Sequence, residues 1–212
     1  MFDIIPGGGG GWRLVDPRPI KAMAPYTFFT PSEAELEALR MGDSVHLAFA
    51  PDKALEGEAE RLWVRIEDRS GPIWQGAVED GRESLPGLEA GSAVSFHPWH
   101  VVAVRECRVD GLEEEARYFA RAHIDPRLLT GEVLLGALER RDEVGQSARR
   151  GVYADTGWFA FGDDDLRPDA MAMHYGPIGL VLNIDDSMMP LLRAPYGTRI
   201  ERWQGGWRRV AL

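Results

Sequence analysis

The sequence predicts an α+β protein made of two small, mostly antiparallel β units with short helices, joined by a helical connector. In several runs of the first half, apolar and polar residues alternate with a period of two, which is typical of half-buried strands. Residues 112–150 instead place apolar side chains near helical spacing. Strand-like runs and a hairpin pattern follow after residue 151. A chain of 212 residues that is 44% hydrophobic can bury one large core or two small ones.

Residues 1–30 are expected to form a flexible or loosely docked arm. They contain five consecutive glycines in PGGGGGW and three prolines in DPRPIKAMAP, and both compositions disfavour a packed conformation. The glycine run lacks the Gly-Lys-Ser/Thr ending, the preceding strand and the following helix of a phosphate-binding loop. Nucleotide binding is therefore not expected here.

Residues 31–111 predict a small α+β domain with a curved antiparallel sheet. In TPSEAELEALRMGD, Thr30 or Ser32 can cap a short helix, and Gly42 can end it. The alternating runs that follow are separated by turn residues, as in a sheet of hairpins. The predicted strands lie at 44–50, at 61–68, at 73–80 and within 90–104.

Residues 112–150 predict a connector of two amphipathic helices that packs on one of its neighbours. The first helix would bury residues of LEEEARYFARAHID, and the second would bury leucines of PRLLTGEVLLGALERRDEV. The apolar positions are Leu112, Ala116, Phe119 and Ala120 in the first helix and Leu134, Leu135 and Leu138 in the second.

Residues 151–212 predict a second, mostly antiparallel α+β unit. GVYADTGWFAFGDDDL is typical of a bent strand or a strand pair, and the Ile, Val and Leu of 176–185 indicate another strand. Asp185 or Asp186 can cap a short helix in DDSMMPLL. TRIERW and WRRVAL, separated by a QGG turn, predict a closing hairpin.

Composition favours a cytoplasmic protein and disfavours several partners. A lone cysteine, Cys107, cannot form an internal disulfide, and neither a signal peptide nor a run of 18 apolar residues is visible. The net charge is −10, and Pro31–Val104 alone holds 14 acidic and 6 basic residues. This charge repels phosphate backbones, so we expect no nucleic acid as partner, and the lack of a long apolar run leads us to expect no membrane. It can attract a basic protein, or it can simply aid solubility.

No short motif identifies a catalytic centre or a cofactor. The sequence lacks G-x-S-x-G, H-E-x-x-H and paired C-x-x-C. His97 and His100 in HPWH are weak candidates for metal ligands, because a zinc site needs a third ligand that the neighbouring sequence does not supply. Half-exposed histidines at the end of a strand are the simpler interpretation. No cofactor is expected.

Three consecutive aspartates, Asp163, Asp164 and Asp165, follow the aromatic run TGWFAFG. An EF-hand loop needs acids at alternating positions, a glycine at the sixth position and a later glutamate, whereas here the acids are consecutive, the sixth position is Pro168 and no glutamate is in register. A solvated turn explains the aspartates more simply. The chain also has seven tryptophans, some of which we expect on a contact surface, because tryptophan is enriched at interfaces. The candidates for partner contacts are Asp163, Asp164, Asp165, Trp158, Trp203 and Trp63.

The last unit resembles a bacterial family of immunity-protein-like domains linked to polymorphic toxin systems. The resemblance rests on DTGWFAFGDDD and on NIDDSMMPLLRAPYGTRIERWQGGW, about 60 of the 212 residues. Its pattern is a Gly-Trp-aromatic stretch ending in Gly and acids, then a short helix of the form Asp-Ser-x-x-x-Pro-Leu-Leu, then a glycine-turn hairpin. The first unit, through MGDSVHLAFA, ERLWVRIED and GSAVSFHPWHVV, resembles a second small bacterial domain whose function is not characterised.

The resemblance implies a non-enzymatic protein-binding module whose partner is another protein, with a basic toxin as the candidate. In such a module an acidic surface loop would contact the partner through charge complementarity. The alternative is a small-ligand or metal-binding enzyme with a site between the two units, using His97, His100 or the Asp163–Asp165 loop. The sequence leaves the oligomeric state open.

Overall fold

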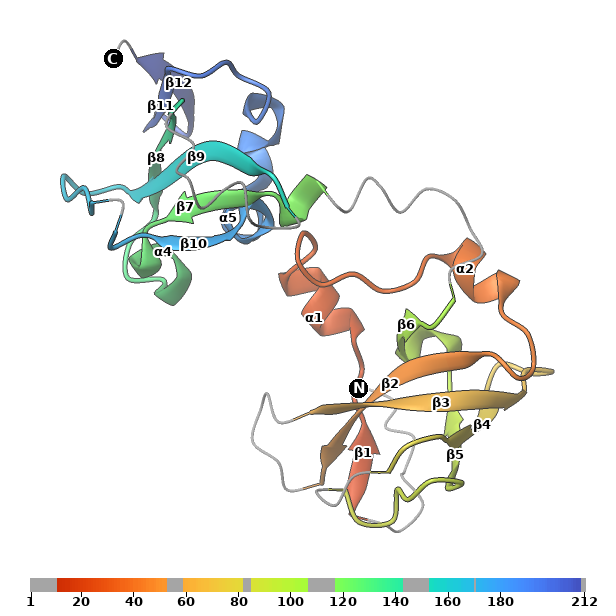
Figure 1. Ribbon diagram of the computed structural model, residues 1–212. Coiled ribbons are helices and arrows are strands. Elements are labelled where there is room, and N and C mark those ends of the chain that lie inside the picture. The colour runs from red at the N-terminus through yellow and green to blue at the C-terminus, as the bar shows by residue number, and fades with distance from the viewer. Residues whose placement is uncertain are drawn as a thin grey trace. The chain divides into compact units, whose positions relative to one another are not determined.

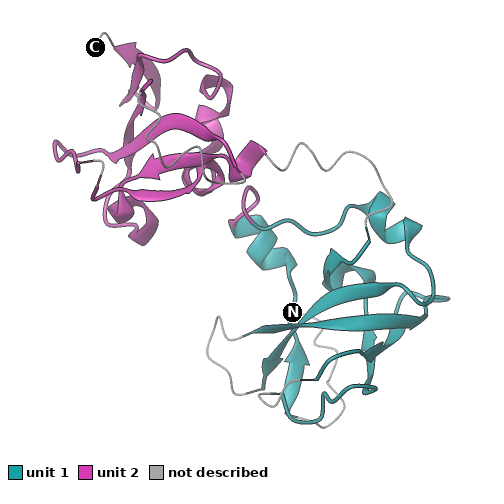
Figure 2. Ribbon diagram, viewed as in Figure 1, with its two compact units in different colours: residues 1–23, 28–111 teal, residues 24–27, 112–212 magenta. Residues whose placement is uncertain are grey.

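The computed structural model divides the chain into two compact units (Figure 2). It describes residues 11–52, 59–81, 85–106, 117–142, 153–169 and 171–210. Unit 1 comprises Met1–Met23 and Phe28–Gly111, and unit 2 comprises Ala24–Thr27 and Leu112–Leu212. Each unit contains one six-stranded sheet and a few short helices, so the fold is mostly β (Figure 1).

Unit 1 is a sheet of order β1-β2-β3-β4-β5, with β6 also paired to β2. Its pairings are all antiparallel, as predicted. Register shifts in the β2–β6 and β3–β4 pairs mark bulges, which bend strands and curve the sheet. The elements are β1 (Trp12–Leu14), α1 (Arg18–Met23), α2 (Glu33–Ala38), β2 (Ser44–Pro51), β3 (Glu60–Asp68), β4 (Trp74–Val78), β5 (Ala93–Phe96), η1 (Pro98–His100) and β6 (Val101–Val104).

The alternating pattern of the strands builds the core of unit 1. Val45, Leu47 and Phe49 of β2 are all fully buried, and they face apolar residues of β3 in the same core. The predicted helix is confirmed as α2, and a capping box defines its start. Ser32 accepts from the amide of Glu35, and the Glu35 carboxylate accepts from the amide of Ser32.

The flexible arm predicted at 1–30 is wrong for residues 11–30. β1 pairs with β2, and Trp12 is only 7% exposed, with its ring against Phe49 at 5.3 Å between centroids. The prediction failed because composition near a glycine run says nothing about one aromatic side chain that a nearby sheet can bury. Residues 1–10, with most of the glycine run, lie outside the described part of the chain.

Unit 2 is a mixed sheet of order β10-β7-β9-β8-β11-β12. All its pairings are antiparallel except the parallel β7–β9 pair. The elements are η2 (Arg117–Phe119), β7 (Arg121–Ile124), α4 (Pro126–Thr130), β8 (Leu135–Arg140), β9 (Asp155–Gly162), β10 (His174–Pro177), α5 (Ile178–Ile184), η4 (Asp186–Leu191), β11 (Thr198–Trp203) and β12 (Gly206–Val210). Short helices cover one face of the sheet: residues of α5 and η4 share a core with β7, β8, β9 and β11.

The helical connector predicted at 112–150 is wrong for residues 117–142. Two strands, β7 and β8, lie there, and both flank β9 in the sheet of unit 2. Leu135 and Leu138 are buried, but on a strand, because short apolar runs fit either period and the neighbouring strands decide between them. The boundary at residue 150 therefore does not separate two folding units, since the longer segment of unit 2 runs from Leu112 to Leu212. The other residues of the predicted connector lie outside the described ranges.

The strand predicted at 176–185 is also wrong in its second part, which forms helix α5. Ile178, Val181 and Leu182 are buried at the i, i+3 and i+4 spacing of a helix face. An apolar run of this length fits a buried strand or a buried helix equally well, so periodicity does not separate them. The later predictions are confirmed: Asp185 caps η4 through the amide of Ser187, and β11 and β12 form the closing hairpin.

The Ala24–Thr27 segment of unit 2 packs against helix α5. The amide of Tyr26 donates to Asn183 Oδ1 at 2.9 Å, and Asn183 Nδ2 donates to Thr27 Oγ1 at 2.7 Å. A Cβ atom at Gly179 would collide with the carbonyl oxygen of Tyr26, so the close approach needs glycine. Four residues from the N-terminal part of the sequence thus complete unit 2.

Candidate functional site

A pocket lies in unit 2 where β9 and β11 end and β8 begins. The registers bring these ends together, because Leu135 of β8 faces Gly162 of β9 and Ala137 of β8 faces Glu201 of β11. The pocket encloses about 370 Å³. It is lined by Leu134, Leu135, Asp163, Ile184, Asp185 and Arg202.

The aspartate loop forms one wall of this pocket and is a solvated bend, as predicted. Asp163 lines the pocket, and its Oδ1 accepts from the amide of Leu134 at 3.2 Å. Asp164 points elsewhere and pairs with Arg127 at 2.6 Å, which holds the pKa of that carboxyl below its usual range. Arg127 also pairs with the buried Asp125. The ion pair between Asp164 and Arg127 therefore anchors the loop to α4. Asp165 is exposed.

Gly136 sets the position of the loop against β8. It lies at a register shift between Leu135 and Ala137, and a Cβ atom there would collide with the backbone of Asp163. The bulge and the glycine together let the chain after β9 pass close over the start of β8. The strand end therefore fixes where the Asp163 carboxylate lies.

The opposite wall is held by polar contacts from three elements. Asp185 pairs with Arg202 of β11 and accepts from the amide and the hydroxyl of Ser187 at 3.0 and 2.6 Å. The guanidinium of Arg202 lies 4.3 Å from the ring centroid of Trp207, whose indole N–H donates to Ser187 at 2.9 Å. This wall is thus fixed before any ligand arrives.

Sequence reasoning found Asp163 but missed the rest of the pocket. Leu134 and Ile184 are 73% and 40% exposed, and nothing in their local sequence marks them as surface residues. Leu134 was assigned to the buried face of a helix, and Ile184 to a strand. Only the registers of β8, β9 and β11 bring these residues beside Asp163 and Arg202.

The three tryptophans expected at a contact surface have different environments. Trp158 is 1% exposed and its indole N–H donates to the carbonyl of Leu192 at 3.2 Å, so its prediction as a contact residue is wrong. It alternates inward on β9, where α5 and η4 cover the sheet. Trp203, at the end of β11, is 52% exposed. Trp63 is half-buried, stacked on His46 at 3.5 Å with Arg105 above its ring.

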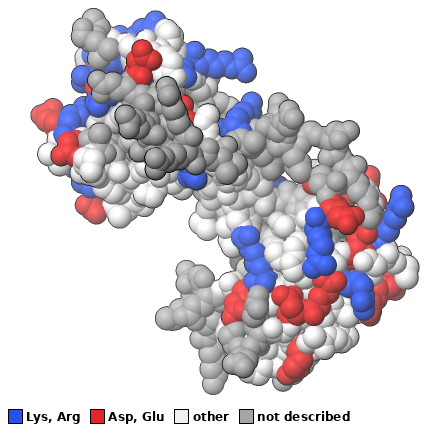
Figure 3. Space-filling view, in the orientation of Figure 1, with Lys and Arg blue, Asp and Glu red and all other residues white. Residues whose placement is uncertain are grey.

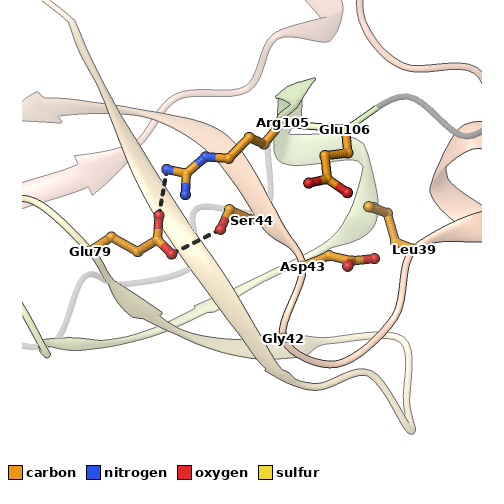
Figure 4. A pocket seen from close by; sticks show the side chains of 7 residues that line it. All are labelled: Leu39, Gly42, Asp43, Ser44, Glu79, Arg105 and Glu106. Carbon is orange, nitrogen blue, oxygen red and sulfur yellow. Dashed lines mark hydrogen bonds and ion pairs between the residues drawn. The ribbon is translucent and has the colours of Figure 1, made fainter.

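A second, more polar pocket of about 260 Å³ lies in unit 1 (Figure 4). The Glu79 carboxylate accepts from the Ser44 hydroxyl at 2.8 Å and pairs with Arg105 at 2.6 Å. Asp43 and Glu106 add two further carboxylates (Figure 4). With three carboxylates and one guanidinium, this lining favours cations over anions.

The rings of His97 and His100, the weak candidates for metal ligands, contact backbone groups. They bracket the η1 turn, where the amide of His97 donates to Nδ1 of His100 at 3.0 Å and His97 Nδ1 lies 2.9 Å from the carbonyl oxygen of Pro72. His100 is 2% exposed, and its ring stacks on Trp99 at 3.7 Å. Among the residues that the structure describes, no group of three or more His, Cys, Asp or Glu could hold a metal ion.

The burial of His100 predicts a loss of stability in acid. Burial lowers the pKa of His100 to about 4; the backbone hydrogen bond from His97 and the charge of Asp16 oppose this shift, whereas the charges of His97 and Arg18 add to it. An unfolded histidine titrates near its ordinary pKa of 6.5, so the unfolded state binds the extra proton first. As the pH falls from 6.5 towards 4, we expect unit 1 to lose about 2–3 kcal/mol of unfolding free energy, allowing for partial solvent screening.

Urea denaturation between pH 4 and pH 7 measures this loss. The variant His100→Gln should show a smaller slope of unfolding free energy against pH, by about one proton. His174→Gln, a change at an exposed histidine of unit 2, is the control and should keep the wild-type slope. Equal slopes for the wild type and His100→Gln would contradict the assignment.

No family model, no curated protein and no solved structure matches this chain. Within the described ranges, no helix combines the length and the apolar character needed to cross a membrane.

Proposed function

We propose that this chain is a protein-binding module whose unit 2 binds a basic protein partner, in the manner of a toxin-immunity protein. The observation that carries the proposal is the exposed aspartate loop beside exposed apolar side chains at one end of the sheet. Carboxylates steer and orient a basic partner, while apolar groups in the middle of a contact contribute affinity.

The charges of the loop are arranged for an external partner. Asp164 is neutralised by Arg127, but Asp163 and Asp165 form no ion pair with any residue that the structure describes. On the face drawn in Figure 3, acidic side chains of both units lie among Arg and Lys side chains. Local complementarity at the loop, more than the net charge of −10, would therefore select the partner.

Apolar exposure near the loop supports the same proposal. Leu134 and Ile184 line the pocket beside Asp163, and Leu166 directly follows the aspartates and is 58% exposed. Trp203 ends the strand that carries Arg202. Exposed apolar side chains next to uncompensated charges are typical of protein contact sites.

The alternative function, small-ligand binding, is favoured by one observation, the polar pocket of unit 1. Its volume suits a small cationic group. Titration of small organic cations into the purified protein separates the two proposals, because saturable binding at this pocket would favour the alternative.

The proposal is tested by capturing a partner from the native lysate and by asking whether co-expression rescues cells from a toxic neighbouring gene product. With the partner in hand, the double change Asp163→Asn with Asp165→Asn should weaken binding roughly 5- to 30-fold, mostly through slower association at low salt. Binding kinetics at two salt concentrations measure this.

The matched control is Asp52→Asn with Glu89→Gln, which removes the same charge from two exposed residues of unit 1. It should leave the affinity within about twofold, because exposed charges outside the contact are screened by salt. Equal effects of the two double variants would mean that the loop acts only through the net charge of the protein and not through a specific contact. A chain that captures no protein and rescues no cell would defeat the proposal.

A further inference from the structure

The pocket of unit 2 combines an apolar surface with one uncompensated carboxylate. Leu134, Leu135 and Ile184 supply the apolar part. Two of the three are substantially exposed, at 73% for Leu134 and 40% for Ile184, so apolar surface faces water in the absence of a partner. Covering it would be favourable, because apolar surface would be removed from water.

The two carboxylates of the pocket differ in what they have left to bind. Asp185 is satisfied by Ser187 and by its ion pair with Arg202. Asp163 accepts only from the amide of Leu134, through Oδ1, among the described residues. Its negative charge and its Oδ2 atom therefore remain available to a cation from outside.

The arrangement suits a lysine side chain better than other cations. An aliphatic stem can lie on Leu134 and Ile184 while the charged head stays near water. A guanidinium that binds both oxygens of Asp163 would have to share Oδ1 with the amide of Leu134, whereas an ammonium can bind Oδ2 alone, so the carboxylate fits lysine better than arginine. The guanidinium of Arg202 disfavours a cation at the Asp185 side, so the head is directed to Asp163.

We propose that this pocket accepts one lysine side chain of the protein partner, with the methylenes on Leu134, Leu135 and Ile184 and the ammonium on Asp163. The proposal rests on the proposed function, because it names the group by which a basic partner is held there. A pocket of about 370 Å³ is at the small end of ligand sites, which agrees with one side chain and not with a large cofactor.

The test uses small probes on the full chain, so that it does not depend on knowing the partner. N-acetyl-lysine N-methylamide is titrated into isotope-labelled protein, and the NMR signals of Leu134, Leu135 and Ile184 are followed. The comparison probes are N-acetyl-norleucine N-methylamide, which keeps the aliphatic stem without the charge, and the corresponding arginine compound. We expect the lysine probe to bind about fivefold more tightly than either.

A pair of matched variants then assigns the charge. Asp163→Asn keeps the oxygen that accepts from Leu134 but removes the charge, so it should bring the affinity for the lysine probe down to that for the norleucine probe. Asp165→Asn, a neighbouring aspartate outside the pocket lining, should change the affinity less than twofold. A dispersed spectrum of each variant shows that the fold is intact.

The outcomes separate the pocket from the proposed function. Lysine-probe shifts that stay away from the three apolar residues, equal affinities for the lysine and norleucine probes, or equal effects of the two variants would each overturn the lysine site. If the probe binds as expected but the chain captures no protein, the proposed function fails while the chemistry of the pocket stands. If a partner binds but none of its lysines is needed for binding, the lysine site fails while the proposed function stands.

Discussion

A fragment of residues 151–212 is expected to remain unfolded, although that stretch contains the whole immunity-like pattern. The fragment keeps β9 to β12 but loses β7 and β8, which flank β9 on both sides. Without β8, the closing hairpin also has no partner, since β11 pairs with β8 in the intact sheet. Strands without neighbours leave backbone groups unpaired and a core that cannot close.

The comparison fragment begins at Leu112 and ends at Leu212, and it retains every strand of the second sheet. We expect it to fold and unfold cooperatively, with stability reduced by the loss of the Tyr26–Asn183 contacts. Far-UV circular dichroism and urea denaturation distinguish the two fragments. Cooperative unfolding of the 151–212 fragment would contradict the sheet order described above.

The change Trp158→Ala is expected to lower the free energy of unfolding of unit 2 by about 3–5 kcal/mol. The side chain is 1% exposed and packs in the core formed with α5 and η4, so its removal leaves a cavity. It also removes the donor to the carbonyl of Leu192. Urea denaturation of the full chain measures the change.

Trp203→Ala is the matched control, with the same substitution at an exposed tryptophan of unit 2. Its ring contacts Arg208 at 4.1 Å, and we expect its loss to cost less than about 1 kcal/mol. The contact role predicted for Trp203 then requires weaker partner binding at unchanged stability. Similar stability losses in the two variants would mean that burial does not distinguish these side chains.

Where the sequence predicted structure correctly, the deciding interactions were local. Ser32 and Glu35 cap a helix from three residues apart, and the alternation in β3 needs only a period of two to separate core from surface. The hairpin at the end follows from a glycine turn between two matched strands. None of these depends on a distant part of the chain.

Where the prediction from sequence was wrong, packing or pairing with elements elsewhere in the chain determined the local structure. The apolar positions around Leu135 and Leu138 fit a helix as well as a strand, and it is pairing with β9 and β11 that makes them a strand. Trp12 is part of the sheet of unit 1 because β2 offers it a free edge, not because of the glycines before it. Burial of Trp158 likewise depends on helices that follow it in the chain.

The sequence by itself indicated a sizeable core, many short strands, and an aspartate turn without the register of an EF-hand loop. Only the tertiary structure decided which residues surround that turn. Leu134 precedes β8, Ile184 ends α5 and Arg202 lies in β11, and these residues, far apart in the sequence, meet because antiparallel registers align strand ends. Such registers are fixed by pairing between strands, which leaves no mark in any single stretch of sequence.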